Sequence, residues 1–252
     1  MPFHLRMTSM KDASFALVLS GGGQFGAYQA GFWLSVHAHV APDWMLGASI
    51  GAVNGWAIAA GRGAEALAER WLRPGAEARL RWRWPKRALS GMLDARAFDE
   101  FLVRLCAEHT PRAGYGCALT ELGRLRRRLV LYPEAGWRHV AASCALFGLL
   151  PQIRLNGRLY TDGGLLGALP LWAAAEVGAT RVLGVDIWNP GEWEQHESHG
   201  VRTLLVRPRR ALGSWVDMLH FSAENAARWV EMGRADGAAA LPRIESWLLG
   251  GL

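Results

Sequence analysis

A lone serine stands between two glycines at the spacing G-x-S-x-G, within the stretch WMLGASIGAVNG at residues 44–55. A serine hydroxyl at a sharp turn between a strand and a helix can attack an ester carbonyl, and Gly47 and Gly51 would permit such a turn. The same pattern also fits a tight turn in which Ser49 only caps the helix. The motif alone leaves both interpretations open.

An aspartate followed by two glycines supplies a candidate base for this serine. A free hydroxyl is hardly ionised at neutral pH, so a nucleophilic serine needs a neighbouring group that accepts its proton. Asp162 stands directly before Gly163 and Gly164, where its carboxylate could approach a ligand closely. Asp-Gly pairs also close ordinary turns, so Asp162 taken alone has a purely structural interpretation.

A glycine-rich run, GGGQFG at residues 21–26, lies between a predicted strand and a predicted helix. Backbone N–H groups in such a loop bind an anion, either a pyrophosphate or an oxyanion, and the helix N-terminus adds partial positive charge. The spacing also matches a dinucleotide-binding loop, which requires an acidic residue at the end of the next strand. Asp43 precedes that strand, so the sequence disfavours nucleotide binding.

These loops belong to two strand–turn–helix units within the first 60 residues. The pattern of apolar residues predicts strands at 15–20 and 44–48, a helix after the glycine run and a helix at 50–60. This order is typical of an α/β fold with a parallel sheet. Further strands are predicted at 115–120, 128–132, 181–187 and 202–207, and further helices at 64–73, 95–108, 137–147 and 168–178.

The remaining segments complete the predicted organisation. Asn156-Gly157 between alternating apolar and polar residues predicts a hairpin with a type I′ turn over 152–161. The polar residues 189–200 are predicted to form a loop, and the tail from about 212 to 252 to be helical. No linker or repeat divides the chain. We therefore expect one domain over residues 1–252, with a catalytic core at about 15–190.

The composition limits the class of protein. The chain has 252 residues, of which 51% are hydrophobic, which suits one sizeable core. No apolar run approaches the roughly 20 residues of a membrane span, and the N-terminus lacks the apolar region of a signal peptide. The three cysteines are too widely spaced to suggest a disulfide framework or a zinc site. We expect a cytoplasmic protein without a metal or cofactor.

Arginine and tryptophan alternate around residues 79–84. Alternation favours a half-exposed strand or extended segment, and a solvated surface loop fits equally well. Tryptophan with arginine suits a membrane interface, and it also suits stacking on single-stranded nucleic acid. We take the segment as a lid or peripheral membrane contact and expect no nucleic-acid partner. Its candidate residues are Arg79, Arg81, Trp82, Arg83 and Trp84.

Taken together, the ordered motifs resemble the patatin-like phospholipase family. The resemblance runs from about residue 15 to at least 188 through GGGQFG, GASIG and DGG, with further similarity in GMLD at 91–94 and in the stretch AASCALFGLLPQIRLNGRLYTDGGLLGALP. The tail HFSAENAARWVEMGRADGAAA resembles the end of bacterial members. The family implies a three-layer α/β/α fold with a mainly parallel central sheet, and a serine–aspartate dyad without a catalytic histidine.

Carried over to this chain, the resemblance assigns roles to individual residues. Ser49 is the nucleophile and Asp162 the base of a hydrolase that acts on phospholipids, lysophospholipids or other fatty-acyl esters through an acyl-enzyme. The backbone N–H groups of Gly21, Gly22, Gly23 and Ile50 are the expected oxyanion hole, and the remaining motif glycines are Gly26, Gly47, Gly51, Gly163 and Gly164. One departure is Phe25, which stands where the family usually carries a basic residue.

Two alternatives remain open on the sequence. An α/β-hydrolase triad would combine Ser49 with an aspartate and a histidine, drawn from Asp162, Asp186, His196, His199 and His220. That fold usually builds several strands before its nucleophile, whereas Ser49 follows only two. The second alternative is a lipid- or membrane-binding module with a degenerate site, which would not need both Ser49 and Asp162.

Overall fold

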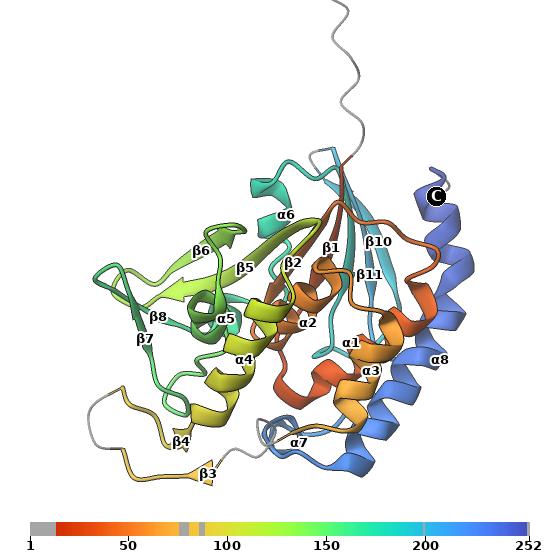
Figure 1. The fold of residues 1–252 in the computed structure, drawn as a ribbon. Coiled ribbons are helices and arrows are strands. Elements are labelled where there is room, and N and C mark those ends of the chain that lie inside the picture. Colours follow the sequence, from red (N-terminus) through yellow and green to blue (C-terminus); the bar gives the residue numbers. More distant parts are fainter. Residues whose placement is uncertain (1–13, 76–80, 86–88, 199, 251–252) are drawn as a thin grey trace, which may run out of the picture.

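The computed structural model describes residues 14–75, 81–85, 89–198 and 200–250 (Figure 1). Arg79 and His199, two of the candidates named above, lie outside these ranges. Within them, none of the helices combines the length and the apolar character that crossing a bilayer requires.

A mixed sheet of nine strands forms the centre of the described residues (Figure 1). The strands lie in the order β10-β11-β9-β1-β2-β5-β8-β7, and β6 pairs with β5. The middle strands β11, β9, β1, β2 and β5 are parallel, and the antiparallel pairs lie toward the two edges. The mainly parallel sheet expected from the sequence is confirmed. The strands are β1 (Phe15–Leu19), β2 (Trp44–Ala48), β5 (Gly114–Glu121), β6 (Arg126–Leu131), β7 (Ile153–Leu155), β8 (Arg158–Thr161), β9 (Arg181–Val185), β10 (Glu194–Ser198) and β11 (Val201–Val206).

Helices cover the two faces of the sheet unequally. Side chains alternate along a strand, so Leu17 and Leu19 of β1 pack into one apolar cluster with α1, α2 and α8, while Ala16 and Val18 pack into another with α6. The result is the expected α/β/α order, with a thick layer on one face and a thin one on the other. The helices are η1 (Gly23–Phe25), α1 (Gly26–Val36), α2 (Ile50–Ala59), α3 (Ala64–Leu72), α4 (Arg96–Glu108), α5 (Trp137–Ser143), η3 (Gly163–Leu166), α6 (Trp172–Glu176), α7 (Trp215–Leu219) and α8 (Ala223–Leu248).

Several sequence predictions differ from the structure. Residues 189–200 include the edge strand β10, whose polar sequence led to the prediction of a loop; charged side chains are common on edge strands because they discourage pairing with other chains. The helix predicted at 137–147 ends at Ser143. The Ala145 N–H bonds to the Ala142 carbonyl, only three residues back, and the Ala145 carbonyl accepts from the Asp162 N–H and the Thr161 hydroxyl. The helix predicted at 168–178 is confined to α6.

The arginine- and tryptophan-rich segment forms a short hairpin rather than part of the main sheet. Strand β3 (Arg81–Trp82) pairs antiparallel with β4 (Leu93–Asp94), and the pair lies at the lower edge of the molecule in Figure 1. We call residues 81–85 and 89–94 the flap. Both Trp82 and Trp84 are exposed, by 72% and 92%, so the alternation does not bury one face of the segment.

Helices α1 and α8 approach each other closely because glycines face the partner backbone. A Cβ atom at Gly31 would collide with the carbonyl oxygen of Val230, and one at Gly233 would collide with that of Tyr28. This contact holds the C-terminal helix against the helix that follows the glycine run.

We expect Gly31→Ala to lower the free energy of unfolding by about 1–3 kcal/mol, because the added methyl group forces two packed backbones apart. Gly55→Ala is the matched control: Gly55 is buried inside α2, and the nearest atoms to its Cβ position lie at 3.8 to 4.0 Å. That change is expected to stabilise the protein by about 0.5–1 kcal/mol through helix propensity. Urea unfolding measures both, and equal effects would contradict the assignment.

Candidate active site

Ser49 occupies a strained turn between β2 and α2. Its φ of 52° and ψ of −127° lie in a region that L-residues seldom adopt. A Cβ atom at Gly47 would collide with the backbone of Gly51, and one at Gly51 would collide with the Leu19 carbonyl oxygen of β1. Both glycines are therefore required for the chain to make this turn against the neighbouring strand.

A second serine, Ser143, fixes the turn from the side. The Ser49 N–H donates to the Ser143 hydroxyl oxygen at 2.8 Å, and the Ser143 hydroxyl donates to the Ala118 carbonyl of β5 at 2.6 Å. Ser143 is fully buried at the end of α5. The sequence reasoning did not single it out, because no local pattern links it to Ser49.

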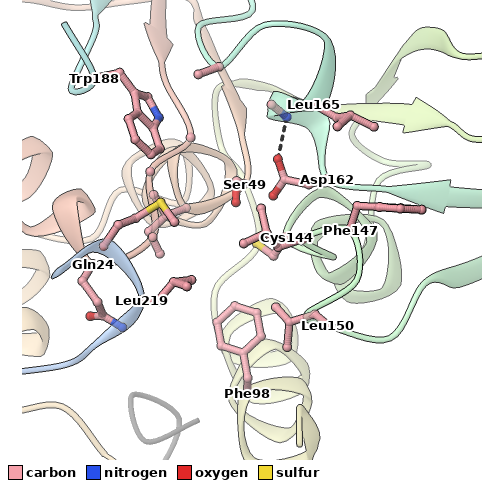
Figure 2. Close-up of a pocket in the computed structure, with 18 residues that line it drawn as sticks. Gln24, Ser49, Phe98, Cys144, Phe147, Leu150, Asp162, Leu165, Trp188 and Leu219 are labelled. Atoms are coloured by element: carbon pink, nitrogen blue, oxygen red, sulfur yellow. Dashed lines mark hydrogen bonds between the residues drawn. The ribbon is translucent and has the colours of Figure 1, made fainter. Parts of the chain in front are cut away.

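Asp162 follows β8 and lies opposite Ser49. Figure 2 shows the Ser49 hydroxyl and the Asp162 carboxylate facing each other. Oδ1 of Asp162 accepts the Gly164 N–H at 2.7 Å, whereas the buried Oδ2 has no hydrogen-bond partner among the described residues. Gly163 lies so close to Ala118 that a Cβ would collide with the Ala118 carbonyl oxygen. The Asp-Gly-Gly motif thus packs its backbone against β5 and leaves one carboxylate oxygen unpaired.

Burial raises the pKa of Asp162 to about 6, although the Ser49 hydroxyl and the Gly164 N–H both act to lower it. The Ser49 hydroxyl is therefore near enough to interact with the carboxyl group, but it falls short of a formed hydrogen bond, since Oδ2 has no partner. Such contacts in ligand-free active sites are often long and shorten when substrate binds.

The glycine run follows β1 and lines the same cavity. The Gly21 N–H donates to the Ala168 carbonyl at 2.9 Å. Because this bond occupies the N–H group, Gly21 does not offer the oxyanion donor that the sequence led us to expect. No acceptor is recorded within the described residues for the N–H groups of Gly22, Gly23 and Ile50, all of which line the cavity. A side chain at Gly23, whose φ is 52°, would meet the Met218 carbonyl oxygen at 2.5 Å.

Phe25 replaces the expected basic residue with an aromatic contact. Its ring is buried and packs edge-on against Trp229 of α8 and against Trp188, with centroids 5.0 and 6.0 Å apart. Gly26 follows it, and a Cβ there would meet Ile50 Cγ1 at 2.6 Å. The ring of Trp229 on α8 therefore packs against Phe25 and supports the glycine run.

A cavity of about 490 Å³ surrounds Ser49 and Asp162 (Figure 2). Its walls are mainly apolar, and Cys144 also lies at the wall. Burial and the nearby Asp162 charge raise the pKa of the Cys144 thiol well above its usual value, so it stays protonated. The apolar wall includes Phe98, Leu146, Phe147, Leu150, Leu165 and Trp188.

The residues required for a dinucleotide site or a histidine-dependent triad lie away from the cavity or form hydrogen bonds with other groups. Asp43 Oδ2 accepts the Phe15 N–H at 2.8 Å at the start of β1, the end of the sheet away from the glycine run. Asp186 accepts the Trp188 N–H and the Asn189 side-chain amide at 3.1 and 2.9 Å. No histidine occurs among the described residues that line the cavity. His196 is on the edge strand β10 and His220 is exposed at the end of α7.

The described residues also contain no group of three or more histidine, cysteine, aspartate or glutamate side chains arranged to hold a metal ion.

The flap is hydrogen-bonded to the segment that forms part of the cavity wall. The N–H groups of Met92 and Leu93 donate to the Leu149 carbonyl, both at 2.9 Å. A Cβ at Gly91 would meet the carbonyl carbon of Leu150 at 2.5 Å, which accounts for the glycine in GMLD.

The raised pKa of Asp162 has a consequence for stability. An unfolded aspartate titrates near 3.9, so the folded state holds the proton more tightly, and stability falls as the pH rises from about 4 to about 6. Above pH 6 the folded and unfolded pKa values of Asp162 differ by about two units, which lowers the free energy of unfolding by about 3 kcal/mol. Asp162→Asn removes the charge and is expected to raise the free energy of unfolding at pH 8, by up to that amount.

The difference in the free energy of unfolding between Asp162→Asn and the unchanged protein should be far smaller at pH 4, because the folded Asp162 is then protonated and neutral. Urea unfolding at the two pH values measures it. A variant that is less stable than the unchanged protein at pH 8 would contradict the buried, unpaired carboxylate.

Comparison with known proteins agrees with this fold and these motifs. The family model described as patatin-like phospholipase matches residues 17–175. Lysophospholipase NTE1 of Debaryomyces hansenii is 26% identical over 195 residues, which cover 71% of this chain and 12% of that protein. Lysophospholipase NTE1 of Meyerozyma guilliermondii is 25% identical over 195 residues, with 71% and 13% covered. The chain thus matches only about an eighth of the length of these relatives.

Among solved structures, VipD from Legionella pneumophila resembles this chain with a TM-score of 0.54 and 12% sequence identity, over 92% of this chain and 67% of that one. At this identity the likeness concerns the fold alone. The family model, in contrast, covers more than half of the chain and includes the glycine run, Ser49 and Asp162. The chain belongs to the patatin-like phospholipase family.

Proposed function

We propose that this protein is a serine-dependent acyl-ester hydrolase in which Ser49 is the nucleophile and Asp162 the base. The observation that carries the proposal is the pairing of two unusual groups. A hydroxyl on a strained turn faces a buried carboxylate whose Oδ2 has no hydrogen-bond partner among the described residues, and both residues line an apolar cavity. Membership of the patatin-like phospholipase family supports the same chemistry.

The reaction proceeds in two halves. Ser49 Oγ attacks the ester carbonyl carbon while its proton passes to Asp162 Oδ2, and the carbonyl oxygen becomes an oxyanion. The alcohol then leaves with the proton from Asp162, and the acyl group remains on Ser49. Water repeats the sequence, with Asp162 first taking and then returning a proton, and releases the fatty acid.

The N–H groups of Gly22, Gly23 and Ile50 are the proposed oxyanion donors. The three residues follow β1 and β2 and line the cavity, and no acceptor within the described residues occupies their N–H groups. Backbone donors held in a fold need little rearrangement when negative charge develops on the carbonyl oxygen. Gly21 is left out because its N–H is bonded to Ala168. Its place next to Ser49, where a Cβ would lie 3.0 Å from the Ser49 Cβ, gives it a spacing role instead.

The raised pKa of Asp162 suits its proposed role. A general base works best when its pKa lies near the working pH, and burial brings this carboxyl group to about 6. It is therefore ionised at neutral pH and still a stronger base than an exposed aspartate. Substrate that fills the cavity would exclude water further and strengthen this effect.

The apolar wall fits an acyl chain, and the relatives matched here carry lysophospholipase in their names. We therefore place the substrate among phospholipids, lysophospholipids and other fatty-acyl esters. A lipid-binding module with no activity is the competing proposal, and it gives no reason for the strain at Ser49.

We also propose that the flap touches a lipid surface. Trp82 and Trp84 are exposed, and tryptophan favours the boundary between headgroups and acyl chains. Trp215 on α7 is 67% exposed, and the same short helix supplies Met218 to the cavity wall. The flap and α7 lie at the same end of the molecule in Figure 1, so both would meet one surface beside the cavity. The exposed Arg81 directly precedes Trp82 on β3 and would contact anionic headgroups.

Ser49→Ala and Asp162→Asn are each expected to reduce ester hydrolysis at least 10³-fold, because each removes a partner of the proton transfer. The assay is hydrolysis of a soluble p-nitrophenyl ester. An active-site-directed phosphonate should label the unchanged protein at Ser49, detected by mass spectrometry, and should fail to label Ser49→Ala. A folded protein that resists the phosphonate would favour the lipid-binding module.

The triple variant His196→Ala, His199→Ala, His220→Ala is the control for a histidine-dependent triad. Its activity should match that of the unchanged protein, and loss of activity with the fold retained would contradict the dyad.

Replacing Trp82 and Trp84 with serine is expected to weaken binding to vesicles that contain anionic lipid by about tenfold, because two interfacial side chains are lost. Leu249→Ser is the matched control, since Leu249 is 89% exposed at the end of α8, away from the flap. Vesicle co-sedimentation measures both. Equal binding by the tryptophan variant and the control would rule out the flap as the contact.

A further inference from the structure

A second cavity, of about 580 Å³, shares a wall with the first. Phe147 lines both, and in Figure 2 its ring points away from Ser49. The other walls come from the turn between β5 and β6, from the β7–β8 hairpin and from Leu89 of the flap. The second cavity therefore lies between the proposed active site, the flap and one edge of the sheet.

Arginine dominates the charge of this second cavity. Arg124, Arg154 and Arg158 line it, and Glu121 is the acidic residue among the described lining residues. The buried Glu121 carboxylate accepts hydrogen bonds from Arg158 and from Arg128 of β6, both at 3.2 Å. Burial opposes the ionisation of Glu121, yet these two arginines outweigh it and hold the pKa of the carboxyl group below its usual value. One negative charge thus faces several positive ones.

Among the described arginines that line the second cavity, Arg154 is the one that remains available to a ligand, because Arg124 and Arg158 both pair with Glu121, at 4.0 and 3.2 Å. Its guanidinium donates to the Gly157 carbonyl at 2.7 Å, across the tip of the hairpin, and the described residues offer it no carboxylate. That bond positions the side chain without neutralising its charge. Arg158 is likewise held by Glu121. Two guanidinium groups are therefore oriented in advance, which reduces the entropy lost when they bind an anion.

We propose that the second cavity binds the phosphate group of a phospholipid headgroup while the acyl chain occupies the first cavity. Arginine matches phosphate because its planar donors pair with two oxygens at once. Arg158 and Asp162 lie four residues apart along and just past β8, a span of about 13 Å at roughly 3.3 Å per residue. An arginine side chain and a glycerol phosphate together bridge that span. The proposal rests on the proposed function, since it assigns the headgroup of the same substrate.

The test compares two substrates with the same acyl chain, lysophosphatidylcholine and monoacylglycerol, which differ in the phosphate. Arg154→Gln is expected to lower kcat/KM for the lysophospholipid about tenfold, mainly through KM, and to leave the monoacylglycerol unchanged. Arg243→Gln is the matched control, because it removes the same charge from an exposed site on α8, at the opposite edge of the molecule from the β7–β8 hairpin (Figure 1). Equal losses on both substrates, or no loss on either, would overturn the proposal.

Inorganic phosphate distinguishes a headgroup from a free anion. If the cavity binds the headgroup, phosphate inhibits lysophosphatidylcholine hydrolysis competitively and leaves monoacylglycerol hydrolysis unchanged. Equal effects on both substrates would indicate a site for free phosphate and overturn the headgroup assignment.

Calorimetric titration with inorganic phosphate separates this inference from the proposed function. If the protein hydrolysed no ester, the proposed function would fail. Phosphate binding that Arg154→Gln weakens and Arg243→Gln preserves would still support the anion site. Absence of such binding would overturn it.

Discussion

The site depends on a backbone crossing that tolerates no side chain. Where β2 turns into α2, Gly51 passes the Leu19 carbonyl of β1 and Gly47 passes Gly51, each too close for a Cβ atom. This crowding forces Ser49 into its positive φ and directs its hydroxyl into the cavity. The crossing also brings the ends of β1 and β2 together, so Gly22, Gly23 and Ile50 line the same cavity. A larger residue at either glycine would displace all of these groups at once.

Asp162 is constrained differently, because its environment lowers stability while it suits the proposed reaction. A buried carboxylate with an unpaired oxygen costs free energy, and the fold compensates with the Gly164 N–H and the tight packing of Gly163 on β5. The same burial gives the carboxyl group a pKa suited to proton transfer. The strained backbone of Ser49 and the unpaired carboxylate of Asp162 thus belong to the two residues that the proposed reaction uses, as is common for active sites.

The sequence predicted those features whose causes are local. The glycines around Ser49 and Asp162, the helix starts and the Asn156-Gly157 turn, where both residues have positive φ, each follow from the backbone needs of neighbouring residues. Ser143 was missed because its partner Ser49 is distant in the chain. The commitment of the Gly21 N–H to Ala168 and the pairing of β10 with β11 also depend on tertiary contacts. The proposed dyad and its donors nevertheless fall within the core expected at about 15–190.

The contact between Phe25 and Trp229 has a consequence for the order of folding. The glycine run is near the start of the chain, and the helix that supports it is near the end. Contacts between such distant segments close large loops and tend to form late. The glycine run therefore acquires its final support only after α8 has been synthesised. A nascent polypeptide that already contains Ser49 and Asp162 would still lack the contact with Trp229, so the proposed oxyanion donors reach their final positions only once α8 has been added.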